Sequence, residues 1–112
     1  MTLMSTRNGG IDLVRETDAS VVEMWGEVDA ALRAEAGLAL AGALERDLPV
    51  VVDATRVQFI DSAGVAFLVQ LCTLGRDEEL AVSLRNPPPV VAEVLHLVGC
   101  DSVIREERTP AA

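Results

Sequence analysis

The feature that most constrains this sequence is a continuous run of β-branched residues followed, after a short connection, by a long apolar segment. Val50-Val51-Val52-Asp53 favours a central strand covered on both faces over an alternating edge strand. Nearly every position from Ser62 to Leu74 is apolar, which is typical of a helix that is deeply packed or faces a partner. A buried strand followed by a buried helix indicates an α/β protein.

A pair of short strands and a helix precede this unit. Ile11–Arg15 and Val21–Trp25 are β-prone runs joined by a polar connection of hairpin length, so we expect them to pair antiparallel. From Ala30 to Arg46 apolar side chains recur at helical spacing, and Asp29 stands where an N-cap belongs. The expected buried stripe of this helix consists of Leu32, Ala36, Ala39, Leu40, Ala43 and Leu44.

The part that follows the apolar helix repeats the alternation. Gly75 is expected to end that helix, and a strand is expected over Leu80–Arg85. The prolines at positions 87–89 favour the start of a third helix, which Gly99 is placed to stop. A final short strand is expected over Ser102–Arg105. The expected buried face of the third helix consists of Val91, Val94, Leu95 and Val98.

The order of these segments, β-β-α-β-α-β-α-β, predicts the fold class. We expect an α/β single domain in which helices pack against a mixed, mostly parallel sheet of four to five strands. The 112 residues suffice for one core that needs neither disulfides nor metal. The expected organisation is a flexible leader over residues 1–10, the domain over 11–105 and a polar tail over 106–112.

Charge and composition exclude several classes of function. Nine basic residues, all arginine, stand against eighteen acidic ones, and the net charge of -9 argues against nucleic acids or anionic membranes as partners. Cys72, Cys100 and the single His96 lack the spacing of a metal site, so we expect no metal or other cofactor. No apolar span or signal sequence occurs, which predicts a cytoplasmic protein without direct membrane insertion and with reduced thiols. The two cysteines are either buried small side chains or a redox pair.

One stretch could carry chemistry, the junction from Phe59 to Val65 that follows the most buried strand, because open parallel sheets place their sites at strand ends. Ser62 is expected to be the N-cap of the apolar helix, with its hydroxyl at the surface. It is either a cap only or a phosphorylation site, where the helix N–H groups and dipole would favour the added charge.

The neighbours of Ser62 leave alternatives open. Gly64 either permits a close backbone approach or is a small residue in a tight turn. Asp61 either positions a metal-bound nucleotide during phosphate transfer or caps and solubilises the junction. Glu27 and Asp29 end a neighbouring parallel strand, which puts them on the same side of the sheet as Ser62, and helix capping with surface charge would also explain them.

An enzyme built on Ser62 is disfavoured. Its segment is not Gly-x-Ser-x-Gly, and His96 lies among apolar residues on a different helix, which is typical of a histidine at the edge of a core. Neither of the glycine-rich nucleotide-binding motifs occurs, and the Gly-Lys loop requires a lysine that the chain lacks. We therefore expect no catalytic residues.

From Ile11 to Arg105 the chain resembles a STAS domain, the module named for sulfate transporters and anti-sigma factor antagonists. Val50-Val51-Val52-Asp53 is followed eight residues later by Asp61-Ser62-Ala63-Gly64-Val65, which is similar to the family's Asp-Ser-(Ser/Thr/Ala)-Gly-Leu helix start. Gly26-Glu27-Val28-Asp29 is similar to the family's Gly-Glu-(Leu/Ile)-Asp, and Leu95-x-x-x-Gly99 resembles its last helix.

Two positions depart from the family pattern. Val65 replaces the usual leucine, and Trp25 occupies a position that is more often small or polar. Trp25 is either a half-buried strand residue or a partner contact. Ser62 itself is retained.

The resemblance implies an anti-sigma factor antagonist that binds a kinase-type anti-sigma factor and thereby releases a sigma factor. The kinase would reverse this by phosphorylating Ser62, near Asp29, and a phosphatase would remove the phosphate. The alternative is a STAS accessory subunit that docks on a lipid-transporting ATPase without a phosphorylation switch. The implied partner-binding residues are Glu27, Asp29, Asp61, Ser62, Ala63, Gly64 and Val65.

Overall fold

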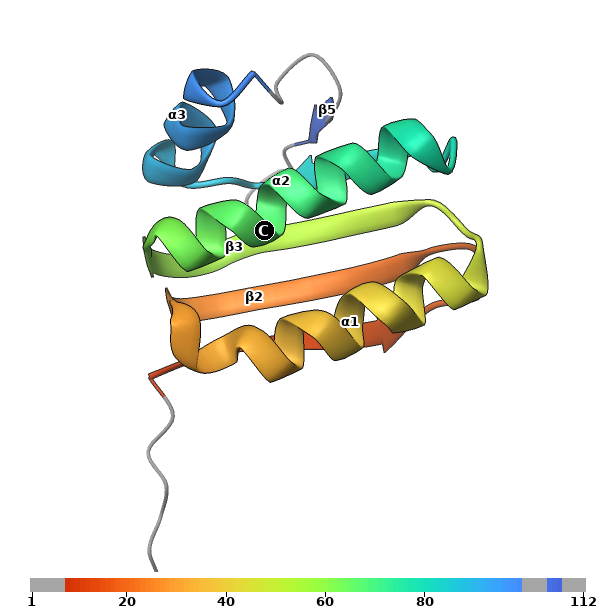
Figure 1. Cartoon of the computed structure of the whole chain (residues 1–112), viewed down its shortest axis with the longest axis horizontal. Coiled ribbons are helices and arrows are strands. Elements are labelled where there is room, and N and C mark those ends of the chain that lie inside the picture. Colours follow the sequence, from red (N-terminus) through yellow and green to blue (C-terminus); the bar gives the residue numbers. More distant parts are fainter. Residues whose placement is uncertain (1–7, 100–104, 108–112) are drawn as a thin grey trace, which may run out of the picture.

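The computed structural model describes residues 8–99 and 105–107, which contain five strands and three α-helices (Figure 1). The strands are β1 (Gly9–Arg15), β2 (Ser20–Val28), β3 (Val50–Ile60), β4 (Val82–Arg85) and β5 (Arg105–Glu107). The helices are α1 (Arg33–Arg46), which follows one turn of 3-10 helix, η1 (Ala30–Leu32), then α2 (Ser62–Asp77) and α3 (Pro89–Leu97).

The strands lie in the sheet in the same order as in the chain, β1-β2-β3-β4-β5. β1 pairs with β2 antiparallel, and the pairs β2–β3, β3–β4 and β4–β5 are parallel. Because parallel crossovers are right-handed and each step moves to the next strand, the connecting helices are directed to one face of the sheet. The predicted fold class, a mixed and mostly parallel α/β sheet, is confirmed.

The central strand is covered by helices on one face instead of two. β3 lies between β2 and β4 as predicted, and α1 and α2 lie side by side over the same face of the sheet (Figure 1). Val50 and Val52 are buried on that face, whereas the alternate residues Val51 and Asp53 are partly exposed. The expectation of cover on both faces is wrong, because a sequential strand order sends successive crossovers to the same side.

The buried stripe of α1 is narrower than its sequence indicates. Ala39 and Ala43 are buried, whereas Leu44 is exposed. Leu38, on the outer side of the helix, is 75% exposed. Ala36 and Leu40 are partly buried and pack against the core, and Leu32 is buried just before the helix, so Leu44 is the one residue of the expected stripe that is exposed.

Helix α2 runs two residues beyond its expected end. Gly75 is a buried residue inside the helix, and a Cβ added to it would lie 2.7 Å from Val82 Cγ2 and 3.1 Å from the Leu80 carbonyl oxygen. The glycine is thus a close contact between helix and chain, and the expectation that it ends the helix is wrong. Strand β4 accordingly begins at Val82, two residues after the expected start.

Helix α3 begins and ends where the sequence predicts. Pro89 is its first residue, and Gly99, with a φ of 77°, follows its end in the left-handed region. Its buried face consists of Val91 and Leu95, whereas Val98 is exposed. The helix packs against α2 and β3.

Several expectations fall on residues outside the described ranges. These residues include the first seven of the expected leader, Cys100, positions 102–104 of the expected last strand, and 108–112 of the tail. β1 already begins at Gly9, and Cys72 is buried. Within the described ranges no helix is long and apolar enough to cross a membrane.

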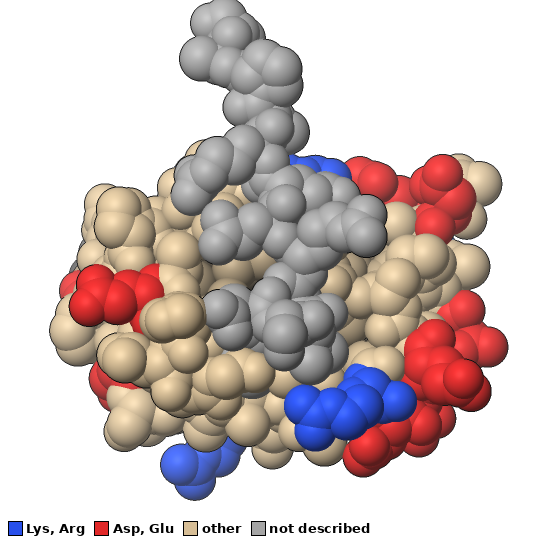
Figure 2. All heavy atoms as spheres, turned by 90° about the horizontal axis from the view of Figure 1, so that it is seen from above, with Lys and Arg blue, Asp and Glu red and all other residues tan. Residues whose placement is uncertain are grey.

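Acidic side chains gather at the end of the molecule where α2 finishes (Figure 2). Asp77, Glu78 and Glu79 lie there, and all three are exposed. The start of α2 lies at the opposite end (Figure 1).

Candidate functional site

Two acidic residues, Asp29 and Asp61, directly follow the ends of the parallel strands β2 and β3. Val28 and Ile60 are the last residues of these strands, and they are register partners. The backbone N–H of Asp61 donates to the Val28 carbonyl oxygen at 3.1 Å, which ties the chain after β3 to the chain after β2. Asp29 follows Val28 directly, so the predicted placement of Asp29 beside the Asp61–Ser62 junction is confirmed.

The N-cap of α2 is Asp61, and the expectation that Ser62 is the cap is wrong. Asp61 has extended backbone angles, and its Oδ1 accepts hydrogen bonds from the backbone N–H groups of Ala63 at 2.9 Å and Gly64 at 3.1 Å. Ser62 is the first residue of the helix. Asp29 acts in the same way for η1, since its Oδ1 accepts from the Ala31 N–H at 3.0 Å.

Ser62 is consequently an exposed residue that the helix start does not use as a cap. The N–H groups of Ala63 and Gly64 are already bonded to the Asp61 carboxylate. A phosphate on Ser62 would therefore lie at the surface beside a charge of the same sign, and those two N–H groups would be occupied. Asp61 therefore makes the start of α2 less favourable for a phosphate on Ser62 than the sequence indicates.

Gly64 permits a close approach between α2 and the strand ends. A Cβ at this position would lie 2.5 Å from Ile60 Cγ1 and 2.8 Å from the Val28 carbonyl oxygen. The glycine is buried, and any larger residue would push the helix away from β2 and β3. Of the two interpretations of Gly64, the structure supports the close approach.

A groove of about 300 Å³ opens between α1 and α2 next to the strand ends. Asp29 and Arg33 lie on its η1 and α1 side, Ala63 and Gly64 on its α2 side, and Phe67 contributes to its apolar wall. A second hollow of about 290 Å³ has three acidic residues, Glu27, Asp29 and Glu35, in its lining. The surface around the start of α2 thus combines apolar walls with several carboxylates.

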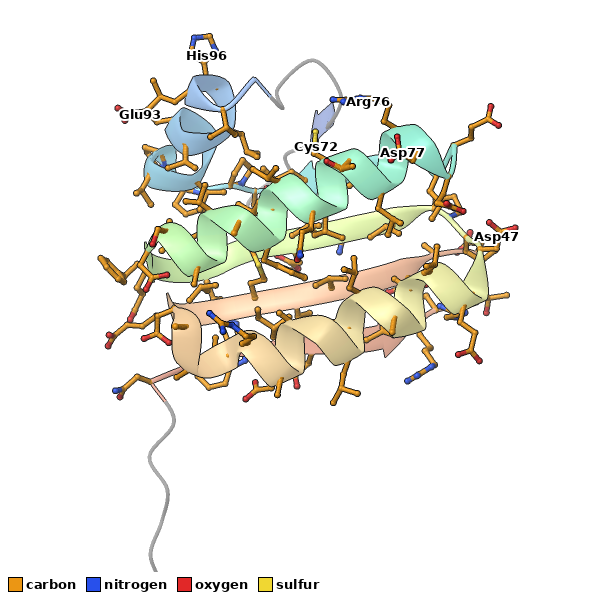
Figure 3. The ribbon with its side chains drawn as sticks, viewed as in Figure 1. Asp47, Cys72, Arg76, Asp77, Glu93 and His96 are labelled. Atoms are coloured by element: carbon orange, nitrogen blue, oxygen red, sulfur yellow. The ribbon has the colours of Figure 1, made fainter. Side chains whose placement is uncertain are left out.

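The other candidate residues from the sequence differ in their exposure and in their distance from the start of α2. Glu27 is exposed at the end of β2, whereas Val65 is partly buried and packs against the core. Val65 therefore supports the helix position more than it offers surface to a partner. His96 points away from α2 at the outer end of α3, so the fold does not bring it toward the start of α2 (Figure 3).

Phe59 is an exposed residue of this region that the sequence analysis does not include among the candidate partner-binding residues. It is the penultimate residue of β3, the register partner of Glu27, and 51% exposed. The sequence offered one signal for this residue, since aromatic residues are rare in the chain, which has only two phenylalanines and one tryptophan.

Trp25 is half-buried on the sheet face away from α1 and α2. Its indole lies over Gly10, where an added Cβ would be 2.5 Å from the ring, and its Nε1–H donates to Asp12 at 3.4 Å. The Arg56 guanidinium carbon lies 6.0 Å from the centre of the ring. These contacts account for the tryptophan as a strand residue.

Nothing in the described ranges groups three or more His, Cys, Asp or Glu side chains in positions suited to a metal ion. Of the two interpretations of Asp61, the structure shows the helix cap.

The fold and this strand-end site are those of a family of small α/β domains. The family described as "Mlab, STAS domain" matches residues 11–106, and the chain belongs to it. No curated protein matches the chain in sequence.

Solved structures share the fold at low identity. The Bacillus cell fate determinant SpoIIAA in its phosphorylated form is 22% identical, with 87% of this chain and 90% of that chain covered and a TM-score of 0.66. An anti-sigma factor antagonist from Mycobacterium paratuberculosis is 21% identical, with 95% and 92% covered and a TM-score of 0.72. RsbS from Moorella thermoacetica is 18% identical, with 89% and 87% covered and a TM-score of 0.74.

Proposed function

We propose that this protein is a cytoplasmic anti-sigma factor antagonist that acts by binding and not by catalysis. It binds a kinase-type anti-sigma factor, which then releases its sigma factor, and phosphorylation of Ser62 by the kinase reverses the binding. The observation that carries the proposal is the exposed Ser62 at the first position of α2, beside the ends of β2 and β3. A phosphatase that acts on phosphorylated Ser62 completes the cycle.

Similar proteins support this proposal. One solved structure of the same fold is an anti-sigma factor antagonist, and another is SpoIIAA in a phosphorylated form. The surface next to Ser62 has features of a partner-binding site, because Ala63 and Gly64 line a groove with apolar walls and with Asp29 and Arg33 as charged residues.

The switch works through the position of the added charge. Phosphorylation adds about -1.5 to -2 charges at pH 7, next to the carboxylates of Asp61 and Asp29. A partner packed against Ser62 would have to desolvate and accommodate this group, and a penalty of about 3 kcal/mol would weaken binding roughly a hundredfold. The domain stays folded, because Asp61 and not Ser62 caps the helix.

The test compares two variants of Ser62 in the presence of a purified partner kinase and ATP. Ser62→Ala should stay bound when ATP is added, whereas Ser62→Asp should bind about a hundredfold more weakly than the wild type. Thr73→Ala is the matched control, since Thr73 is an exposed hydroxyl on the same helix. Binding is measured by titration calorimetry, and mass spectrometry locates the phosphate.

The kinase is obtained by affinity capture on the wild-type protein without ATP, followed by identification. If Ser62→Ala and Ser62→Asp both bound and responded to ATP like the wild type, the proposal would be wrong. Capture of a membrane transporter ATPase together with an unmodified Ser62 would instead favour the accessory-subunit alternative.

A further inference from the structure

The chain contains three aromatic rings, and the most exposed of them, Phe59, stands at the penultimate position of β3, three residues before Ser62. Phe67 is 4% exposed in the core, and Trp25 is half-buried against Gly10. Phe59 is 51% exposed. An aromatic ring left in water forfeits the free energy of burying a large apolar surface, and contact with a partner would recover it.

The strand geometry directs Phe59 outward. Val28 and Ile60 belong to the buried core, and they alternate with Glu27 and Phe59, which are exposed. Since successive side chains of a strand point to opposite faces, Glu27 and Phe59 project from the face opposite the core. Glu27 and Phe59 are also register partners, so an aromatic ring and a carboxylate stand next to each other.

The negative charge around Phe59 indicates which kind of partner can bind this surface. Glu27, Asp29 and Asp61 all lie at the ends of the same two strands, and against these three carboxylates stands one arginine, Arg33, which lines the groove beside Asp29. A second copy of this chain would bring the same carboxylates and a net charge of -9 against them, which disfavours self-association through this surface. Nucleic acids and anionic membranes are disfavoured for the same reason. A protein that presents cations is the complementary partner.

We propose that Phe59 is the anchor of the partner interface. Its ring inserts into an apolar pocket of the partner, and an arginine or lysine side chain at the rim of that pocket faces Glu27, the register partner of Phe59. The partner surface over Asp61 and Ser62, in contrast, is closely packed and uncharged. Aromatic residues that fill a pocket near the centre of an interface contribute a large share of binding free energy. This inference rests on the proposed function for the identity of the partner only.

Photo-crosslinking tests the contact directly. A photoreactive p-benzoylphenylalanine replaces Phe59 in one protein and Leu38 in the control, because Leu38 is 75% exposed on the outer side of α1. Position 59 should crosslink to a partner that mass spectrometry identifies, position 38 should not, and the added Ser62→Asp change should remove the crosslink. A crosslink from position 38 alone, or from neither position, would overturn the inference.

The identified partner is then purified and titrated with unmodified variants. Phe59→Ala should weaken binding about tenfold or more, Phe59→Leu should weaken it less, and Leu38→Ala should leave it within about twofold. Glu27→Gln should lower the association rate and its dependence on salt. Circular dichroism checks that each variant is folded. If Phe59→Ala does not fold, Phe59→Leu serves as the test, because leucine keeps an apolar side chain in the strand.

The two proposals fail in different ways. Phe59→Ala binding that matches the wild type overturns the anchor even when the partner is a kinase that phosphorylates Ser62. A partner that is not a kinase, bound with the predicted loss for Phe59→Ala, supports the anchor and contradicts the proposed function.

Discussion

At the scale of single residues, Asp61 and Ser62 divide two tasks that the sequence assigns to one. Asp61 caps α2 through its carboxylate, which leaves the hydroxyl of Ser62 at the surface. Aspartate and serine are comparable N-caps, so local preference alone could not choose between them. The choice follows from β3, which continues to Ile60 and leaves Asp61 as the first residue before the helix.

This division predicts effects of different size on the stability for two neighbouring substitutions. Asp61→Ala should lower the free energy of unfolding by about 1 kcal/mol, the usual cost of losing an N-cap side chain. Ser62→Ala should change it by less than about 0.5 kcal/mol, as is usual for a surface substitution. Urea denaturation monitored by circular dichroism measures both. A larger loss for Ser62→Ala would mean that the serine is the cap.

At the scale of elements, α2 lies close to the sheet because two of its residues have no side chain. Gly64 approaches the ends of β2 and β3, and Gly75 approaches β4. Together they set the distance between the apolar helix and the strands along most of its length. The position of the candidate site depends on this distance, because Asp61 and Ser62 lie at the same end of α2 as Gly64.

Alanine substitutions at two helical glycines should therefore have opposite signs. Gly64→Ala should destabilise the protein by about 1–3 kcal/mol, since the Val28 carbonyl oxygen and Ile60 leave no room for a methyl group. Gly37→Ala in α1 should stabilise it by up to about 1 kcal/mol, because nothing lies within 4 Å of the added Cβ and alanine is the better helix former. Thermal unfolding compares the two. Stabilisation by Gly64→Ala would contradict the close approach.

At the scale of the whole molecule, charge acts through its distribution. The chain carries a net charge of -9, with an exposed acidic group at the end of α2 far from Ser62 (Figure 2). Phosphorylation would change the net charge only to about -11. A switch at Ser62 therefore depends on where the new charge lies and hardly on the total.

The excess of negative charge predicts that moderate salt stabilises the protein. Raising sodium chloride from about 0.02 to 0.2 M shortens the Debye length to less than about 10 Å and screens repulsion among the carboxylates, so the melting temperature should rise. Asp77→Asn is a suitable comparison, since it removes one charge from the acidic end, and its melting temperature should rise less with salt. Calorimetry measures both. A melting temperature that falls with added sodium chloride would contradict this account.

The sequence by itself determined the order of the elements, the start of α3 within the prolines at positions 87–89 and the cap at Asp29, because each depends on residues that are near one another in the chain. The mostly parallel sheet followed from that order through the general rule for strand-helix-strand connections. Only the tertiary structure decided which residue caps α2, which face of the sheet the helices cover, why Gly75 lies inside a helix and that Phe59 is exposed. These features depend on contacts between segments far apart in the sequence, such as the hydrogen bond from Asp61 to Val28. The pattern of residues within one segment does not indicate which distant segment it will contact.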